Sequence, residues 1–442
     1  MSASAREFDI VLFGATGFVG RLTARHLAAE APDGVRIALA GRSQSRLEDL
    51  ARGLGSQAAG WPLLVVDATN PDAVADLARR AHVVVTTVGP YVKYGVPLAA
   101  ACAEAGTHYC DLTGEVLFVH RSIAANHETA KRTGARIVHA CGFDSIPSDL
   151  GVMLTAQAAK ADGADLGRTH LAVRSMKGGF SGGTIDSARV QVDELKADPT
   201  TRRIVGDPWA LAEGPRPGRD RTVASVTGAT ASGSSGSAES SGSSGASGPA
   251  AVLAKLAKAS PVKRDADNGH FTGPFVMAAF NTRIVARSAS LLGYGEGFRY
   301  VEYSDYGSGP AGAVAAGMTS VALGAGLAGM AFGPTRSLLD RVLPKPGEGP
   351  SEEAQAAGRF RMEVTGEATN GARYRTTVAA PYDPGYSGTA VMLGQAALAL
   401  LEDGDALPDA AGVLTPATAI GMPLVERLRE HKFMLDTVRL PG

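Results

Sequence analysis

The sequence has 442 residues, of which 45% are hydrophobic and 20% are charged, and its formal net charge is -1 at pH 7. This is an ordinary globular composition with room for two domains, and it excludes a protein that attracts nucleic acid through an overall positive charge. The cysteines Cys102, Cys110 and Cys141 form no Cys-x-x-Cys pair, so we expect neither a disulfide scaffold nor a metal site.

Short apolar runs alternate with helical patterns over the first 150 residues, and no signal-peptide core precedes them. We therefore expect a cytoplasmic protein. The apolar runs predict strands at 8–13, 35–40, 63–66, 83–88, 107–112 and 136–140. The helical patterns cover 17–29, 45–54, 71–80, 96–105 and 123–133. This alternation predicts βαβ units and an α/β domain, residues 1–150, with a doubly wound parallel sheet.

The alternation weakens after residue 150. Further strands are predicted at 170–175, 298–303, 360–365 and 374–379, and a long apolar helix at 386–401. We expect residues 151–385 to form an α+β domain with a mostly antiparallel sheet. The C-terminal helices of 386–442 are then predicted to return to the first domain.

Two segments of the second domain have unusual compositions. Residues 214–269 include a tract of Gly, Ser and Ala that buries too little apolar surface to order itself, which predicts a flexible insertion. Residues 306–335 contain no charged residue. This segment fits a buried helix or a homodimer interface, a peripheral contact with a membrane, or a membrane-spanning helix.

The loop after the first predicted strand is rich in glycine and leads into the first predicted helix. Its sequence is Gly14-Ala15-Thr16-Gly17-Phe18-Val19-Gly20. Glycines at this spacing permit a tight turn, a close approach of the backbone to a pyrophosphate, and close packing of the helix on the strand. The free N–H groups of the helix then face the phosphates. The loop predicts a Rossmann domain that binds a dinucleotide.

The end of the second predicted strand selects the cofactor. It carries Arg42 and Ser43 and no acidic residue, a pattern that favours the 2′-phosphate of NADP(H) over the ribose hydroxyls of NAD(H). An ordinary surface arginine is the alternative. Asp67 ends the third predicted strand, where it can contact the adenine amino group or cap the next helix.

Residues at the ends of later strands are candidates for the chemistry. The fourth predicted strand ends at Val88-Gly89-Pro90-Tyr91, beside the expected nicotinamide position. Tyr91 and Lys93 follow it on a predicted loop, together with Tyr94, and are candidates for proton donation.

Two polar clusters, 111–115 and 139–145, end the fifth and sixth predicted strands at the same edge, and Asp144 in the second is a catalytic candidate. Their alternative role is structural, as caps and turns. Lys177 opens a second glycine-rich loop, 177–184, which suits a substrate lid or a wide turn. No tyrosine is followed by a lysine four residues later, so the proton-transfer pair of short-chain dehydrogenases is missing.

Several motifs together resemble the saccharopine dehydrogenase-like oxidoreductases, and among them the actinobacterial trans-acting enoyl reductases. They are the glycine loop, 40–42, 88–91, 94–95, 105–115, 141–149, 177–185, 281–285, 344–350 and 383–386. The resemblance implies NADPH-dependent reduction of enoyl groups on acyl chains carried by a polyketide synthase, in lipid or glycolipid biosynthesis. It also fits a protein at the inner face of the plasma membrane. A saccharopine-type amino-acid oxidoreductase and a non-catalytic NADP-binding, lipid-associated scaffold are the alternatives.

Overall fold

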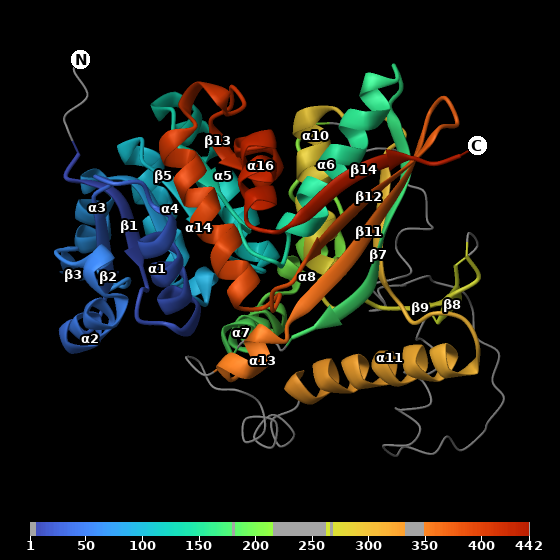
Figure 1. The fold of residues 1–442 in the computed structure, drawn as a ribbon, viewed down its shortest axis with the longest axis horizontal. Coiled ribbons are helices and arrows are strands. Elements are labelled where there is room, and N and C mark those ends of the chain that lie inside the picture. Colours follow the sequence, from blue (N-terminus) through green and yellow to red (C-terminus); the bar gives the residue numbers. More distant parts are fainter. Residues whose placement is uncertain (1–5, 179–181, 215–261, 266–267, 332–348, 442) are drawn as a thin grey trace.

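The computed structural model describes residues 6–178, 182–214, 262–265, 268–331 and 349–441. Two seven-stranded sheets stand side by side, with the N-terminal sheet on the left of Figure 1 and the second sheet on the right. The first sheet is parallel throughout and has the order β13-β6-β5-β4-β1-β2-β3. The predicted doubly wound α/β architecture is confirmed.

The strands of the first sheet are short and apolar because helices cover both of its faces. In β1, for example, five of the six residues of FDIVLF are buried. The strands are β1 (Phe8–Phe13), β2 (Ile37–Gly41), β3 (Leu63–Val65), β4 (Ala81–Thr86), β5 (His108–Asp111), β6 (Arg136–Val138) and β13 (Gly412–Leu414). The helices between them are α1 (Phe18–Glu30), α2 (Gln44–Leu54), α3 (Pro71–Arg80), α4 (Tyr91–Ala105) and α5 (Val116–Thr133).

The second sheet is mostly antiparallel, as predicted, and only β10 and β7 pair in parallel. Its order is β14-β12-β11-β7-β10-β9-β8. The strands are β7 (Leu166–Lys177), β8 (Lys263–Arg264), β9 (Phe271–Gly273), β10 (Arg299–Asp305), β11 (Arg359–Ala368), β12 (Arg373–Ala380) and β14 (Met434–Arg439).

Helices join the two sheets into one body. α6 (Ile146–Ala161) and α10 (Ala278–Leu292) pack on the second sheet and lie between the sheets in Figure 1. One hydrophobic cluster includes side chains of β1, α6 and β11. The boundary predicted at residue 150 therefore falls inside α6, a helix that packs on the second sheet.

The C-terminal part of the chain contributes to both sheets. α14 (Ser387–Glu402) is apolar on all sides and is buried from Gly388 to Leu400, packed against α1, β4 and β5. β13 then extends the first sheet beyond β6, and α15 (Pro416–Ala419) and α16 (Met422–Glu430) follow. The last strand, β14, pairs with β12 in the second sheet. The prediction of helices alone for 386–442 missed both strands, which are short and pair with strands that are distant in the chain.

The predicted flexible insertion, 214–269, lies mostly outside the described residues. Within it, however, Lys263 and Arg264 form β8 and pair with Thr272 and Phe271. The prediction of a loop is wrong for these two residues, because the hydrogen bonds that order them come from β9 and not from their own composition.

The uncharged segment 306–335 is described as far as residue 331, and most of it is α11 (Pro310–Ala331). Gly312, Ala316 and Ser320 are its buried side, next to β9, whereas Val314 is 61% and Met318 is 69% exposed. The prediction of a helix buried inside this chain is therefore wrong for the exposed side of α11. No helix within the described ranges has the length and hydropathy needed to span a membrane.

Candidate active site

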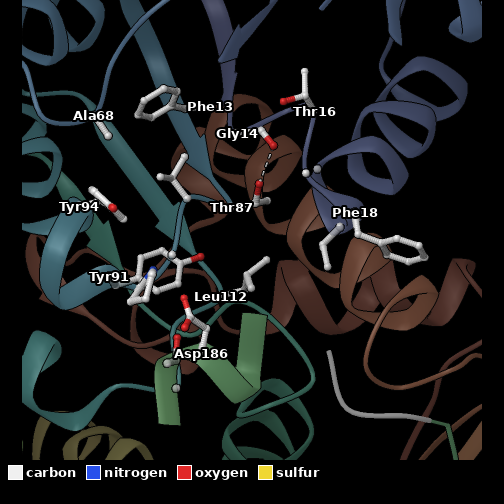
Figure 2. A pocket seen from close by; sticks show the side chains of 18 of the residues that line it. Phe13, Gly14, Thr16, Phe18, Ala68, Thr87, Tyr91, Tyr94, Leu112 and Asp186 are labelled. Atoms are coloured by element: carbon white, nitrogen blue, oxygen red, sulfur yellow. Dashed lines mark hydrogen bonds between the residues drawn. The ribbon is translucent and has the colours of Figure 1, made fainter. Parts of the chain in front are cut away.

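A cavity of about 1010 Å³ lies at the carboxyl ends of the parallel strands, where ligands bind in open α/β sheets. The loops after β1, β2, β3, β4 and β5 line it, and α7 (Gly182–Ala197) and residues 276–280 close it from the second domain. Figure 2 shows the glycine loop, Thr87 and Tyr91 around this cavity. One end, where we expect the adenosine, has the form of a phosphate site, and the other end, where we expect the nicotinamide, combines apolar side chains with the acids Asp144 and Asp186.

The glycine loop folds back tightly after β1. Gly14 has a φ of +87°, and a Cβ there would lie 2.7 Å from the Thr87 hydroxyl oxygen, which donates a 3.0 Å hydrogen bond to the Gly14 carbonyl. Gly17 precedes α1 without a side-chain cap. The first N–H groups of α1 therefore have no partner within the helix and point toward the cavity, as a pyrophosphate site requires.

Replacing Gly20 with alanine tests the close packing of this loop. A Cβ at Gly20 would collide with the Gly14 carbonyl oxygen and lie 3.0 Å from the backbone of Ala15. We expect the free energy of unfolding to fall by about 1–3 kcal/mol and the affinity for NADP(H) to fall with it. Thermal unfolding and cofactor titration measure both. Alanine at Gly206, where a Cβ has open space and which does not line the cavity, is the control, and equal effects at the two positions would contradict the argument.

Two arginines define the adenosine end. Arg42 and Arg46 are exposed and line the cavity. Arg46 was missed in the sequence, although its position four residues after Arg42 could have indicated it. Ser43 does not line the cavity, and its hydroxyl oxygen accepts the N–H of Arg46 at 3.5 Å as the cap of α2.

Asp67 also lines the adenosine end and does not cap α3. Its carboxylate accepts the backbone N–H of Thr69 at 2.9 Å. This hydrogen bond lowers the pKa of the Asp67 carboxyl group, and so does the nearby Arg42. The cap of α3 is Asn70, so the helix-cap alternative for Asp67 is wrong. Contact with the adenine stays a prediction.

At the nicotinamide end, Val88, Gly89 and Pro90 line the cavity together with Tyr91. Tyr91 begins α4, so the predicted loop is helical here. Its ring stacks on Phe118 at a centroid distance of 5.6 Å, and its hydroxyl donates to the Thr86 carbonyl at 3.2 Å. Burial raises the pKa of this phenol well above its usual value, which makes Tyr91 a poor proton donor.

Glu115 explains why α4 begins at this point. Its buried carboxylate accepts the N–H of Tyr91 at 2.8 Å, the N–H of Val92 at 2.7 Å and the hydroxyl of Ser187 at 2.7 Å. A carboxylate at a helix N-terminus satisfies free donors and favours the helix dipole. Glu115 thus connects α4 to α7, a structural role.

Asp111 and His139 also have structural partners. The Asp111 carboxylate accepts from the Tyr109 hydroxyl at 2.8 Å and from the Ala140 N–H at 2.9 Å, and it contacts His139 Nδ1 at 2.7 Å. The other ring nitrogen of His139 is 2.8 Å from the Ser122 hydroxyl. Because this network is buried and satisfied, it stabilises the sheet edge.

Asp144 differs from these residues. Its side chain is partly exposed to the cavity, and none of the described residues forms a hydrogen bond with its carboxyl group. Burial without a compensating partner raises its pKa from the usual range to about 7. A carboxyl group that is partly protonated at neutral pH is suited to general acid catalysis.

The two lysine candidates lie elsewhere. Lys93 is exposed on α4 and does not line the cavity, whereas Tyr94 beside it does. Lys177 is exposed at the end of β7, opposite Arg359. The geometry thus leaves both lysines outside the cavity.

Other residues of the cavity were missed in the sequence. Residues 179–181 of the second glycine-rich loop lie outside the described residues, but α7 follows and brings Asp186, Ser187 and Gln191 to the cavity. Tyr386, before α14, packs edge-on against Phe18 at 4.8 Å. Nothing local marks Asp186, Ser187 and Gln191, because tertiary packing alone brings them to the first domain, whereas Tyr386 belongs to the motif 383–386 but was not assigned to the site.

The chain is similar over its whole length to mycobacterial proteins. A protein of Mycobacterium tuberculosis is 46% identical over 451 residues, and the trans-acting enoyl reductase of Mycobacterium bovis is 44% identical over 447 residues. Each alignment covers 100% of both chains. The chain belongs to the trans-acting enoyl reductase family. This confirms the resemblance that the motifs indicated.

Two further similarities agree with membership of the enoyl reductase family. Residues 10–138 match the saccharopine dehydrogenase NADP binding domain. The apo saccharopine dehydrogenase (L-Glu forming) of Saccharomyces cerevisiae has a TM-score of 0.52 and covers 98% of this chain and 100% of its own, at 12% identity. At that identity the likeness concerns the fold alone. The chain is thus an NADP(H)-dependent oxidoreductase, as predicted.

The residues of the cavity fit NADP(H). A Cβ at Gly14 would meet Thr87 and Val88, and one at Gly20 would collide with the Gly14 carbonyl oxygen, so the loop has the tight, side-chain-free turn that the close approach of a pyrophosphate requires. Arg42 and Arg46 provide two cations for a 2′-phosphate at the end of β2, where the sequence has no acid.

Proposed function

We propose that this protein is an NADPH-dependent enoyl reductase that acts in trans on an acyl chain held as a thioester by a polyketide synthase. The supporting observation is the position of Asp144, a carboxyl group with a pKa of about 7 in the same cavity as the glycine loop. The proposed setting is lipid or glycolipid biosynthesis.

In the proposed reaction the cofactor supplies the hydride and the protein supplies the proton. NADPH, when bound, supplies a hydride for the β-carbon of the enoyl group. Asp144 donates a proton to the α-carbon and is reprotonated from solvent through the open cavity. Leu112 and Met277 line the cavity beside Asp144 and provide an apolar surface for the reacting carbons.

The distribution of charge favours a neutral acyl substrate over an amino acid. The cations that line the described cavity, Arg21, Arg25, Arg42 and Arg46, belong to α1 and to the region of α2, at the cofactor end. The charged residues contributed by α7 and the β6–α6 loop are the acids Asp186 and Asp144. A dicarboxylic substrate of the saccharopine type would therefore meet carboxylates and no guanidinium partner there.

Turnover tests the proposal. NADPH oxidation by the full chain is expected with 2-enoyl pantetheine thioesters and not with an imine of lysine and a keto acid. Turnover of the imine alone would replace the proposal with the amino-acid oxidoreductase. NADPH binding with no turnover of either substrate would favour the non-catalytic scaffold.

We also propose peripheral contact between α11 and the inner face of the plasma membrane, supported by the exposed Val314 and Met318 on a helix without charge. The protein is expected to float with lipid vesicles, and the double variant Val314→Asp, Met318→Asp to lose that association while keeping its reductase activity. A wild-type protein that stays unbound would refute the contact. A dimer that dissociates in the variant would assign α11 to a subunit interface instead.

A further inference from the structure

A second, smaller cavity adjoins the active-site cavity, and Asp144 lines both. This second cavity has a volume of about 50 Å³, and we name it the annex. The two cavities share five lining residues, namely Val19, Leu112, Asp144, Val276 and Met277. The remaining walls of the annex include Phe143, Phe275, Met176 and Thr389. A substrate atom in contact with Asp144 would therefore lie next to the annex.

The walls of the annex provide almost no polar partner. The Thr389 hydroxyl is already engaged, since it donates to the Pro384 carbonyl at 2.8 Å and accepts the Phe143 N–H at 3.1 Å. Asp144 is the one ionisable side chain among the described residues that line the annex. A charged or hydrogen-bonding group placed there would lose its water without compensation, whereas an alkyl group would gain from burial.

The side chains that line the annex differ in how deeply they are buried. Phe275 is only 5% exposed and belongs to the hydrophobic core, so its ring forms a fixed wall. The Phe143 ring is held edge-on against Phe360 at 4.9 Å. Met176, in contrast, is 40% exposed near the end of β7 and forms the wall toward solvent. The rings of Phe275 and Phe143 therefore bound the annex inside the protein, and Met176 bounds it toward solvent.

We propose that the annex is a subsite for a short alkyl portion of the acyl substrate and that its walls limit this portion to about four carbons. The limit follows from the volume, since one water-sized group needs about 10–15 Å³ of such space. The inference rests on the proposed enoyl reductase function and adds a length limit to it. A longer chain must pass Met176 into solvent, where additional methylenes gain little.

Binding of saturated acyl pantetheine thioesters tests the limit without turnover. The NADP⁺-loaded full chain is titrated calorimetrically with acetyl to dodecanoyl thioesters. The affinity is expected to rise about fourfold per methylene up to about the hexanoyl or octanoyl thioester and to change little afterwards. Affinity that is independent of length, or that rises steadily to dodecanoyl, would overturn the annex assignment.

Substitutions in the walls of the annex test whether these walls set the limit on chain length. Phe275→Leu enlarges its fixed wall and Met176→Ala opens its outer wall, so both are expected to move the plateau to longer chains. Phe298→Leu is the matched control, because Phe298 is equally buried but lines neither cavity. Met176 is partly exposed, so its variant is expected to fold even if Phe275→Leu does not. An unchanged plateau in a folded Met176→Ala protein would refute the assignment.

The two proposals fail in different ways. If enoyl thioesters are reduced but the affinity for saturated thioesters shows no limit in chain length, the annex assignment is wrong and the enoyl reductase function stands. If no enoyl thioester is reduced but saturated chains bind with the expected plateau, the reductase function is wrong and the alkyl subsite stands.

Discussion

Replacing Asp144 with asparagine is expected to lower kcat for enoyl reduction by about 10²–10⁴-fold, the usual contribution of a general acid. Asparagine keeps the size of the side chain but has no proton to donate to the α-carbon. Asp144 contacts the cavity without a hydrogen-bond partner among the described residues, so the change should leave the fold and NADPH affinity nearly unaltered. Steady-state kinetics with an enoyl thioester and fluorescence titration with NADPH measure the two effects.

The pH dependence gives the same assignment a second test. Burial raises the pKa of Asp144 to about 7, and the reaction needs the protonated acid. The wild-type rate should therefore be highest below about pH 7 and fall about tenfold per pH unit above it. This descending limb should be missing in the asparagine variant.

Asp186 offers a matched control for this result. It lines the same cavity, and Asp186→Asn makes the same chemical substitution at a second position in it. We expect a smaller loss of rate and an unchanged descending limb. Equal losses in both variants, or a limb that survives in Asp144→Asn, would exclude Asp144 as the proton donor.

Replacing Arg42 or Arg46 with alanine is expected to raise the KM for NADPH by about 10–100-fold each, since a hydrogen bond to a charged group contributes about 1.5–3 kcal/mol. The KM for NADH should hardly change, because NADH lacks the 2′-phosphate. Both arginines line the cavity where β2 ends, so the double variant should lose most of the preference for NADPH.

Arg25→Ala provides the comparison for the cofactor variants. Arg25 also lines the cavity but lies on α1, where it is 3.9 Å from Glu352. Its loss should affect NADPH and NADH alike. If Arg42→Ala weakens both cofactors equally, the assignment of the 2′-phosphate to this end is wrong.

Much of the first domain was predictable because the signals are local. The run Phe8–Phe13 is buried on both sides and is followed directly by the glycine loop, so strand, turn and helix appear in one short stretch. Arg42 was identified for the same reason, since it ends the next strand. Lys93 and Lys177 were selected because one follows a predicted strand end and the other opens a glycine-rich loop, but in the folded chain both are exposed to solvent and neither lines the cavity.

The amino-acid sequence by itself determined the parallel sheet, the dinucleotide loop and the family, because these depend on residues that are neighbours in the chain. Only the tertiary structure decided the active-site walls. It brought α7 and residues 276–280 to the strand ends and left Asp144 partly exposed to the cavity without a hydrogen-bond partner among the described residues. A raised pKa and an apolar annex depend on which distant segments exclude water, and that exclusion exists only in the folded chain.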